Sequence, residues 1–362
     1  MAFDFPNSPT VGQVYNGYVW DGQAWQVQGA ATFGAVRYDI AQGLTANQQA
    51  QARSNTGVTK KNYIINGAMM VSQENGAAAS GAVGYYPVDG FFTSNTSAAI
   101  ANAQQMPAVT GSSPAGSPNR LRITVITADA AVAAGDVYGL AHRIEGLRIA
   151  DLGFGEASAK TVTLSFGVKA PAGTYCVSFL NSAANRSYIA EYVIAAGEAN
   201  TDVVKSVTIQ ADVTGTWLKD NGNGLQITWT LMAGSTYQQA VGSWGTGNAY
   251  GSSNQFNFMG TNGNVFELFD VSLTEGSVAP PFMVPDYASE LAACRRYWQP
   301  YPALVVEDSA KCQSSILTDP MRANPTVTGG GAGFAVFSPS NTHMTFAQTA
   351  RGTQNLVLNA RL

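Results

Sequence analysis

The sequence contains little charge and no long apolar run. Only 12% of its 362 residues are Asp, Glu, Lys or Arg, against about 25% in an ordinary soluble domain. The formal net charge is -4 and no basic cluster occurs, so we expect no binding to nucleic acid, which depends on grouped Lys and Arg at phosphates. No stretch approaches the ~18 consecutive apolar residues of a membrane-spanning helix, so we expect no membrane insertion.

Cysteine and histidine are also scarce. The three cysteines, Cys176, Cys294 and Cys312, are too few and too far apart for a disulfide framework or a zinc site, and we interpret them as small buried apolar residues. The two histidines, His142 and His343, stand alone, without a second ligand at metal-binding spacing. The sequence therefore predicts no metal, no cofactor and no histidine-based catalytic site.

Acidic residues leave one enzymatic alternative open. Glu145, Asp151 and Glu156 are close in sequence, and a pair of carboxylates can hydrolyse a glycosidic bond. Spacing alone does not establish such a pair, and we expect the chain not to be an enzyme. The first ten residues, MAFDFPNSPT, have neither a basic start nor an apolar run, so we expect no secretory signal and synthesis in a cytosol.

The segment VYNGYVWDGQAW, residues 14–25, combines aromatic residues with two turn signals. Asn-Gly at 16–17 and Asp-Gly at 21–22 supply the positive φ angles of two-residue hairpin loops, which predicts a three-stranded meander. Counting outward from these turns places Tyr15 opposite Tyr18, and Tyr18 opposite Trp25. The alternation of a strand then puts Trp20 on the same face.

This aromatic face needs a cover, because three strands are about the lower limit for an independently stable sheet. The rest of the chain is one possible cover, and another subunit or protein is the other. The candidate docking or oligomer-interface residues are Tyr15, Tyr18, Trp20 and Trp25.

Residues 35–61 are polar, alanine-rich and compatible with a helix. Thr45 and Gln48 have the spacing of a capping box and Gly57 falls where a helix would stop, which predicts a short helix over 46–55. Such a helix is marginal alone in water. It is therefore either a plain linker or a helix that meets its copies around a symmetry axis.

From residue 62 onward the sequence has the pattern of β-structure. Val162, Leu164, Phe166 and Val168 alternate with polar residues, and the same period recurs in YCVSFL, YIAEYVI, VVKSVTIQ, LQITWTL, QFNFMG and VFELFDVSL. Turn signals separate these segments, which is typical of a two-sheet antiparallel sandwich or jelly roll. The fold class that we predict is mainly β.

One helix is predicted near the end of this region. Asp286 can cap it, and Tyr287, Leu291, Cys294 and Trp298 then share one helical face. Residues 299–362 follow as a smaller β unit, with strands at AVF and MTF. The predicted domains are 1–34 (attachment module), 35–61 (helical connector), 62–298 (jelly roll) and 299–362 (C-terminal β unit).

Aromatic and amide side chains on a rigid β scaffold are the residues with which proteins bind sugars, since flat rings stack on pyranose faces and amides bond hydroxyls. The loop GSWGTGNAYGSS supplies the main glycan-binding candidates, Trp244 and Tyr250. Tyr237 and Trp217 are weaker candidates. For Trp217 and Trp229, which lie in strand-like segments, we favour a place in the core.

Three segments resemble the jelly-roll module of tail fibres and related appendage proteins of tailed bacteriophages: residues 138–194, 215–231 and 266–298. That module is similar to carbohydrate-binding modules. The segment 36–58 resembles a connector of phage fibres, and SPTVGQVYNGYVWDGQAWQ resembles a motif at the start of many such proteins. The resemblance implies no catalytic residues. It implies a virion structural protein, generally a trimer, made in the host cytoplasm.

The resulting hypothesis is a tail fibre subunit. It docks to other virion proteins by its N-terminus and binds a host cell-surface glycan with its β domains. A capsid decoration or head fibre protein of the same build is an alternative that the sequence does not separate from it. A polysaccharide depolymerase is a second alternative, although the sequence has no long β-helix repeat.

Overall fold

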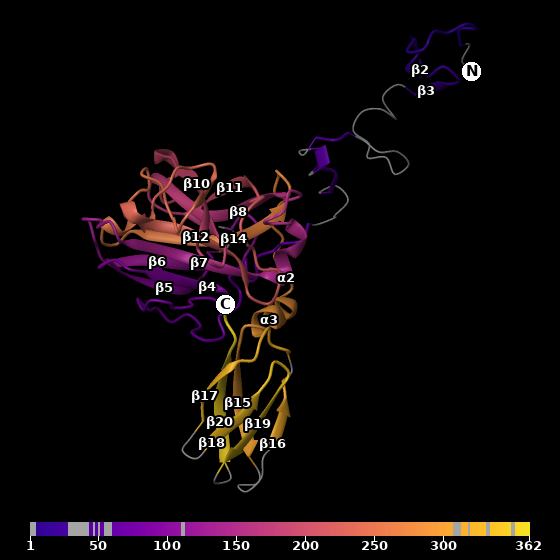
Figure 1. Ribbon diagram of the computed structural model, residues 1–362. Helices are drawn as coiled ribbons and strands as arrows, with labels where there is room; N and C mark the ends of the chain where they lie inside the picture. Colours follow the sequence, from indigo (N-terminus) through magenta and orange to yellow (C-terminus); the bar gives the residue numbers. More distant parts are fainter. Residues whose placement is uncertain are drawn as a thin grey trace. The chain divides into compact units, whose positions relative to one another are not determined.

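The computed structural model of the chain describes residues 5–27, 43–45, 48–49, 51–53, 60–109, 113–306, 313–317, 319–330, 334–348 and 352–362. The chain is mainly β, as predicted, with five antiparallel sheets among the described residues (Figure 1). It divides into two compact units, residues 1–58 and 59–362.

The N-terminal unit contains the predicted meander, made of β1 (Val14–Tyr15), β2 (Tyr18–Trp20) and β3 (Trp25–Val27). Tyr15 pairs with Tyr18, as predicted. The prediction of Tyr18 opposite Trp25 is wrong, because Trp20 pairs with Trp25. The cause is the loop between β2 and β3, which has four residues instead of two. The Asp21 carboxylate accepts hydrogen bonds from the backbone N–H groups of residues 23 and 24, at 2.8 and 2.7 Å, and stabilises this longer loop.

The connector contains the predicted capping box. The Thr45 N–H donates to Gln48 Oε1 at 2.9 Å, and the Gln48 N–H donates to Thr45 Oγ1 at 3.4 Å. Residues 48–49 and 51–53 are helical. The remaining residues of the predicted helix, 46, 47, 50, 54 and 55, and Gly57 lie outside the described residues.

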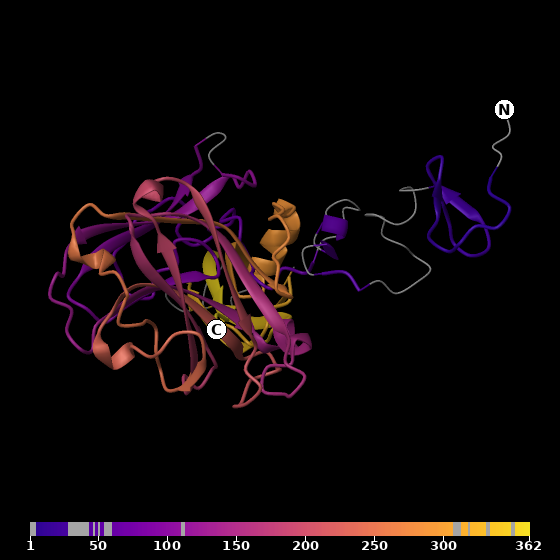
Figure 2. The same ribbon diagram turned by 90° about the horizontal axis from the view of Figure 1, so that it is seen from above.

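The second unit begins with a sandwich of two sheets, seen from the side in Figure 1 and from above in Figure 2. The six-stranded sheet has the order β13 (Trp244–Thr246), β10 (Arg186–Ile194), β9 (Gly173–Leu180), β12 (Asn223–Ala233), β7 (Val137–Glu145), β4 (Phe91–Asn95). The five-stranded sheet has the order β11 (Val203–Gln210), β8 (Thr161–Lys169), β14 (Val265–Glu275), β6 (Asn119–Thr127), β5 (Ile100–Pro107). Short helical turns connect some of the strands: α2 (Gly146–Ile149), η1 (Ala150–Leu152), η2 (Ala196–Glu198), η3 (Ser235–Tyr237) and η4 (Phe258–Gly260).

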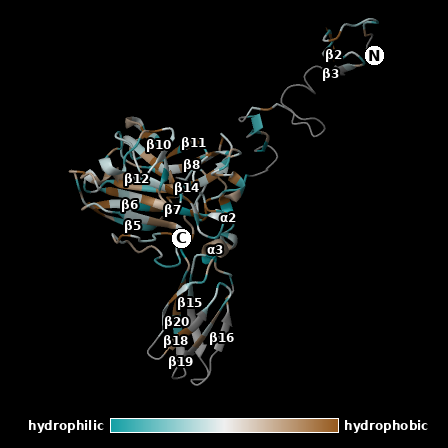
Figure 3. Cartoon of the chain, in the orientation of Figure 1, coloured by the Kyte–Doolittle hydropathy of each residue, from teal (hydrophilic) through white to brown (hydrophobic). Residues whose placement is uncertain are grey.

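The core lies between the two sheets, where every second residue of each strand points inward. The predicted apolar set of residues 162, 164, 166 and 168 is fully buried. It packs in one cluster with residues of β12 such as Trp229, which is also fully buried. Figure 3 shows the resulting recurrence of hydrophobic positions along the strands of the sandwich. The inward alternation fixes which side chains face outward, and those form the sites discussed below.

Two β predictions are wrong. Residues 62–90 contain no strand, although several of their side chains, including Tyr63, Ile64 and Met69, are buried. The segment QFNFMG, residues 255–260, contains no strand, and its last three residues form the 3₁₀ turn η4. Its Asn257 side chain donates to the Asp129 carbonyl at 2.8 Å, which favours a turn over a paired strand.

The predicted helix is α3 (Tyr287–Arg295), and Asp286 caps it by accepting a hydrogen bond from the Ser289 N–H at 3.0 Å. Its predicted apolar face is only partly right. Cys294 is buried, but Tyr287 is 55% exposed, and Trp298 begins a strand instead of continuing the helix.

The C-terminal β unit consists of two three-stranded sheets. Their strands are β15 (Trp298–Val306), β20 (Gly352–Asn359) and β17 (Thr326–Gly329) in one sheet, and β16 (Gln313–Ile316), β19 (His343–Gln348) and β18 (Phe334–Pro339) in the other. A small core of its own lies between them, with Met344, Phe346 and Leu358 among its buried members.

Cys176 and Cys294 are buried free thiols, as predicted, and Cys312 lies outside the described residues. Among the described residues, the helices are all too short or too polar to cross a membrane.

Candidate functional site

The outer face of the six-stranded sheet carries two of the predicted sugar-binding residues, Tyr237 and Tyr250. Leu225, Ile227 and Trp229 of β12 point into the core, so Gln226 and the other alternate residues of this strand point outward. Arg143 of β7 lies directly opposite Gln226 in the strand pairing. This face is rigid, since every strand that builds it is paired with a neighbour.

A long loop after β12 crosses this face and brings two predicted residues together. The Thr230 hydroxyl donates to the Tyr250 carbonyl at 2.6 Å, and the Tyr250 N–H donates to the Tyr237 carbonyl at 2.8 Å. The two tyrosine rings meet edge to face, with centroids 5.7 Å apart. Both rings are half-buried, so each keeps an accessible surface.

The polar groups around Tyr250 are supplied by the strands beneath it. Burial is the main influence on the Tyr250 hydroxyl and raises its pKa, while the nearby side chains of Asn248 and Gln226 act in the opposite direction. Arg143 donates from Nε to Gln226 Oε1 at 2.9 Å, and its guanidinium lies 4.7 Å from the Phe92 ring centroid.

These contacts form one continuous strip of aromatic, amide and guanidinium groups. We call it the Tyr250 strip. Its members are Tyr237, Tyr250, Gln226, Arg143 and Phe92. Aromatic faces beside fixed hydrogen-bond donors and acceptors suit a ligand that has both apolar C–H faces and hydroxyls.

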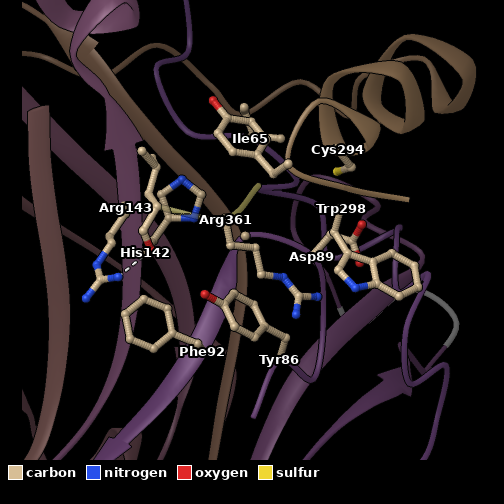
Figure 4. Close-up of a pocket in the computed structure, with 12 residues that line it drawn as sticks. Ile65, Tyr86, Asp89, Phe92, His142, Arg143, Cys294, Trp298 and Arg361 are labelled. Atoms are coloured by element: carbon tan, nitrogen blue, oxygen red, sulfur yellow. Dashed lines mark hydrogen bonds between the residues drawn. The ribbon is translucent and has the colours of Figure 1, made fainter. Parts of the chain in front are cut away.

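At Phe92 the strip meets a small pocket, shown in Figure 4. Arg361 lies between two rings, 3.7 Å from the centroid of Tyr86 and 5.5 Å from that of Trp298. The pocket volume is about 30 Å³, which is enough for a water molecule and too small for a sugar ring. We interpret the pocket as part of the packing between the sandwich and the C-terminal residues.

Trp244 lies apart from the Tyr250 strip, on the edge strand β13. Its Nε1 donates to the Gln210 carbonyl at 2.8 Å, and its ring packs edge-on against Trp217 at 5.3 Å. Trp244 is half-buried against the core, and Trp217 is buried, as favoured from the sequence. The glycan-binding role of Trp244 stays a prediction, but its indole N–H is already used by the protein.

In the N-terminal unit, all four docking candidates share one face of the meander. Tyr15, Tyr18, Trp20 and Trp25 are each half-buried. Phe5, which the sequence analysis missed, stacks on Trp25 with centroids 5.1 Å apart and meets Tyr18 edge-on at 5.2 Å. Even so, none of residues 5–25 is fully buried.

Each of the three carboxylates considered as glycosidase residues pairs with another side chain of the protein. Glu145 accepts from Arg296 at 2.7 Å. Asp151 accepts from the Tyr63 hydroxyl at 2.7 Å, and hydrogen bonds from Tyr63 and Lys61 lower its pKa. Glu156 pairs with Lys219, which lowers the pKa of Glu156. The general acid of a glycosidase has a raised pKa. The pKa values of Asp151 and Glu156 are shifted in the opposite direction, which does not suit that role. Within the described residues, no group of His, Cys, Asp and Glu has the arrangement of a metal site.

Part of the strip could not be found from the sequence. Gln226 and Arg143 occupy outward positions of alternating strands, which is a readable signal. Their proximity depends on the pairing of β7 with β12, which are more than 70 residues apart in the chain.

The comparisons with known proteins gave neither a family model nor a curated relative that matches this chain. Solved structures with a partial likeness include the enzymatically active domain of tailspike protein 4 of bacteriophage CBA120, with TM-score 0.31 and 11% identity over 59% of this chain and 21% of that one. The family 11 carbohydrate-binding module of a Clostridium thermocellum cellulosomal cellulase aligns with TM-score 0.28 and 10% identity, over 55% of this chain and 96% of the module. TmCBM61, solved with β-1,4-galactotriose, aligns with TM-score 0.29 and 13% identity, over 60% and 99%. Because these TM-scores are low, the alignments do not support the fold assignment, which depends on the sheets described above.

Proposed function

We propose that this chain is a structural subunit of a tailed-bacteriophage appendage, a tail fibre, that binds a host surface glycan through its sandwich. The observation that carries the glycan-binding part is the Tyr250 strip. It places two accessible tyrosine rings, an amide and a guanidinium on one rigid sheet face. A pyranose ring stacks on such rings while its hydroxyls bond the polar groups.

The proposed attachment to the particle rests on the N-terminal unit. A three-stranded sheet with five aromatic rings on one face, none of them fully buried, gains stability when another surface covers those rings. The segments that resemble phage fibres lead us to propose other virion proteins and sister copies of this chain, in a trimer, as that cover. The protein would be made in the host cytoplasm and carried on the virion.

We propose that the chain acts by contact and not by catalysis. Incubation of the purified protein with bacterial surface polysaccharides is then expected to release no reducing ends. Measurable release would favour the depolymerase alternative.

The test of the glycan site is Tyr250→Ala, measured by calorimetric titration with polysaccharide fragments from host cell surfaces. We expect the affinity to fall by about tenfold or more, the loss expected for a stacking anchor at the centre of a site. Tyr287→Ala removes a tyrosine that is 55% exposed on α3, and it serves as the control with unchanged affinity. Equal affinity in both variants, with both folded, would argue against the proposal.

A further inference from the structure

The outer face of the five-stranded sheet carries two rows of hydroxyl side chains that cross three strands. In the first row, Ser165 of β8 pairs with Ser206 of β11 on one side and with Ser272 of β14 on the other. In the second row, Thr163 pairs in the same way with Thr208 and Thr274. Neighbouring strands are about 4.8 Å apart, so each row presents hydroxyls at that spacing.

Within these rows, the protein provides hydrogen-bond partners for some hydroxyls and not for others. Thr163 and Thr208 are bonded to each other at 2.9 Å, and the Thr163 hydroxyl also donates to the Gly276 carbonyl at 2.7 Å. In contrast, the hydroxyls of Ser272 and Thr274 are buried with no hydrogen-bond partner. Ser272 is 4% exposed and Thr274 is 1% exposed. Leaving such a group unpaired costs about 1–3 kcal/mol. A bound molecule that formed hydrogen bonds with these two hydroxyls would remove that cost.

A proline-rich segment between β14 and α3 lies over this face, since it lines cavities together with residues of both rows. It reads SVAPPFMVP, residues 277–285. Within the described part of the chain, residues 278–285 form no hydrogen bond. Phe282 anchors it, since its ring packs close to Gly67. The Ser277 carbonyl at the start of the segment accepts from the Thr208 hydroxyl at 3.4 Å, so residues 278–285 can shift without breaking a hydrogen bond of their own.

Cavities lie on both sides of this segment. The larger has a volume of about 580 Å³, with a floor that includes Thr163, Ser165 and Ser206 and a wall at residues 277–282. The smaller, of about 230 Å³, is lined by Ser272 and Thr274 under the same segment. The larger volume falls within the usual range of ligand pockets, roughly 300–1,000 Å³.

The chemistry of the larger cavity restricts its ligand. Asp270 is the single ionisable residue among the residues that line it. The Asp270 carboxylate already accepts hydrogen bonds from the hydroxyls of Ser113 and Ser117 and from the Ala115 N–H. An anionic ligand would find no counter-charge among these residues, and the Asp270 oxygens are already used as hydrogen-bond acceptors. Serine hydroxyls both donate and accept, so they match a neutral ligand that does the same.

We propose that the larger cavity, which we call the groove, is a second binding site, for a neutral oligosaccharide whose hydroxyls bond Ser165 and Ser206 on its floor. The site lies on the opposite sheet from the Tyr250 strip. It shares the ligand class of the proposed function but none of its residues. An extended peptide is a poorer match, because the floor presents side-chain hydroxyls from the face of the sheet and not the backbone N–H and C=O groups that pair with an added strand.

The test uses the full chain with ¹³C-labelled threonine methyl groups, since Thr163, Thr208 and Thr274 report on the groove. Neutral di- to hexasaccharides of glucose, galactose, mannose and N-acetylglucosamine are titrated by NMR. We expect at least one to shift these methyl signals saturably. Ser206→Phe, which fills the floor, is expected to weaken that binding by about tenfold or more.

Two controls separate this site from the Tyr250 strip and from misfolding. Tyr250→Ala is expected to keep the shifts in the groove, even if it abolishes binding at the strip. If Ser206→Phe does not fold, the double variant Ser165→Ala/Ser206→Ala replaces it, because neither hydroxyl has a partner among the described residues whose loss would destabilise the sheet. Two results would overturn the proposal. In the first, no oligosaccharide shifts these methyl signals, so that water alone occupies the groove. In the second, the shifts persist unchanged in Ser206→Phe or in the double variant that replaces it.

Discussion

His142 is buried in the sandwich beside aromatic rings. It is 1% exposed, and its ring lies 4.5 Å from that of Phe91. Its Nδ1 has no hydrogen-bond partner. Burial, with the positive charge of Arg148 as a smaller cause, lowers the pKa of His142 from 6.5 to about 3. The side chain is therefore neutral in the fold at pH 7 and resists protonation as the pH falls.

This shift predicts a pH dependence of stability. In the unfolded chain, His142 takes up a proton below pH ~6.5. In the folded chain, the His142 ring stays neutral until the pH approaches its pKa of about 3. Between these values the free energy of unfolding falls by about 1.4 kcal/mol for each pH unit lost. His142→Gln removes this group, so we expect its unfolding free energy to depend less on pH between 6.5 and 4.5 than that of the native chain, measured by urea denaturation.

The second histidine provides the control for this prediction. His343 is exposed, and its Nδ1 is hydrogen-bonded with the Ser340 hydroxyl at 2.8 Å. Since the chain has two histidines in all, His343→Gln is expected to keep the native pH dependence. Identical slopes in the two variants would contradict the assignment.

The burial of a single residue can be predicted where it depends on the local sequence pattern. The strand-like context of Trp217 and Trp229 favours the core, and both are buried. The sequence predicts a polar loop around Trp244, but residues 244–246 form an edge strand that pairs with β10. Its neighbours are distant in sequence, and the glycine-rich composition around it gave no sign of that pairing.

At the scale of elements, strand identity followed from alternation, but irregularities in pairing did not. The alternation of residues 161–169 and 265–275 predicts β8 and β14. The pairing of these strands shifts between Phe269 and Ser272, and Asp270 in between has φ of +50°. Such a bulge depends on contacts made across strands. The segment VFELFDVSL gives no local signal for it.

The bulge leads to a prediction for Gly167, which pairs with Phe269. A Cβ atom at Gly167 would overlap the Phe269 ring, which is fully buried and has the Arg120 guanidinium 4.1 Å from its centroid. Gly167→Ala is therefore expected to lower the free energy of unfolding by about 1–3 kcal/mol, the usual cost of overpacking, as measured by chemical denaturation.

Gly197 gives a matched control for this substitution. A Cβ atom there meets nothing within 4 Å, and its φ is not in the left-handed region. Gly197→Ala is expected to leave stability unchanged or slightly raised. A Gly167→Ala variant as stable as Gly197→Ala would mean that the ring moves away at no cost.

At the scale of the whole molecule, the mainly β class and the sandwich could be predicted, since they follow from the period of hydrophobicity. The composition of the N-terminal segment also predicted an aromatic face. What surrounds this face was not predictable, because Phe5 reaches it from outside the meander. The register error at Trp25 had no effect on this conclusion, since a four-residue loop still leaves all four rings on one side.

The docking proposal predicts that Trp25 matters for assembly more than for the fold of residues 59–362. Trp25 contacts Phe5, Tyr15 and Trp20 on the exposed aromatic face. If a partner covers this face, Trp25→Ala costs about 3 kcal/mol of association free energy. We expect less of the variant in purified particles, measured by mass spectrometry, and a weaker trimer in sedimentation. Val14→Ala changes an exposed residue on the opposite face and should assemble normally. Particles that carry normal amounts of a trimeric Trp25→Ala protein would mean that the aromatic face is not the docking surface.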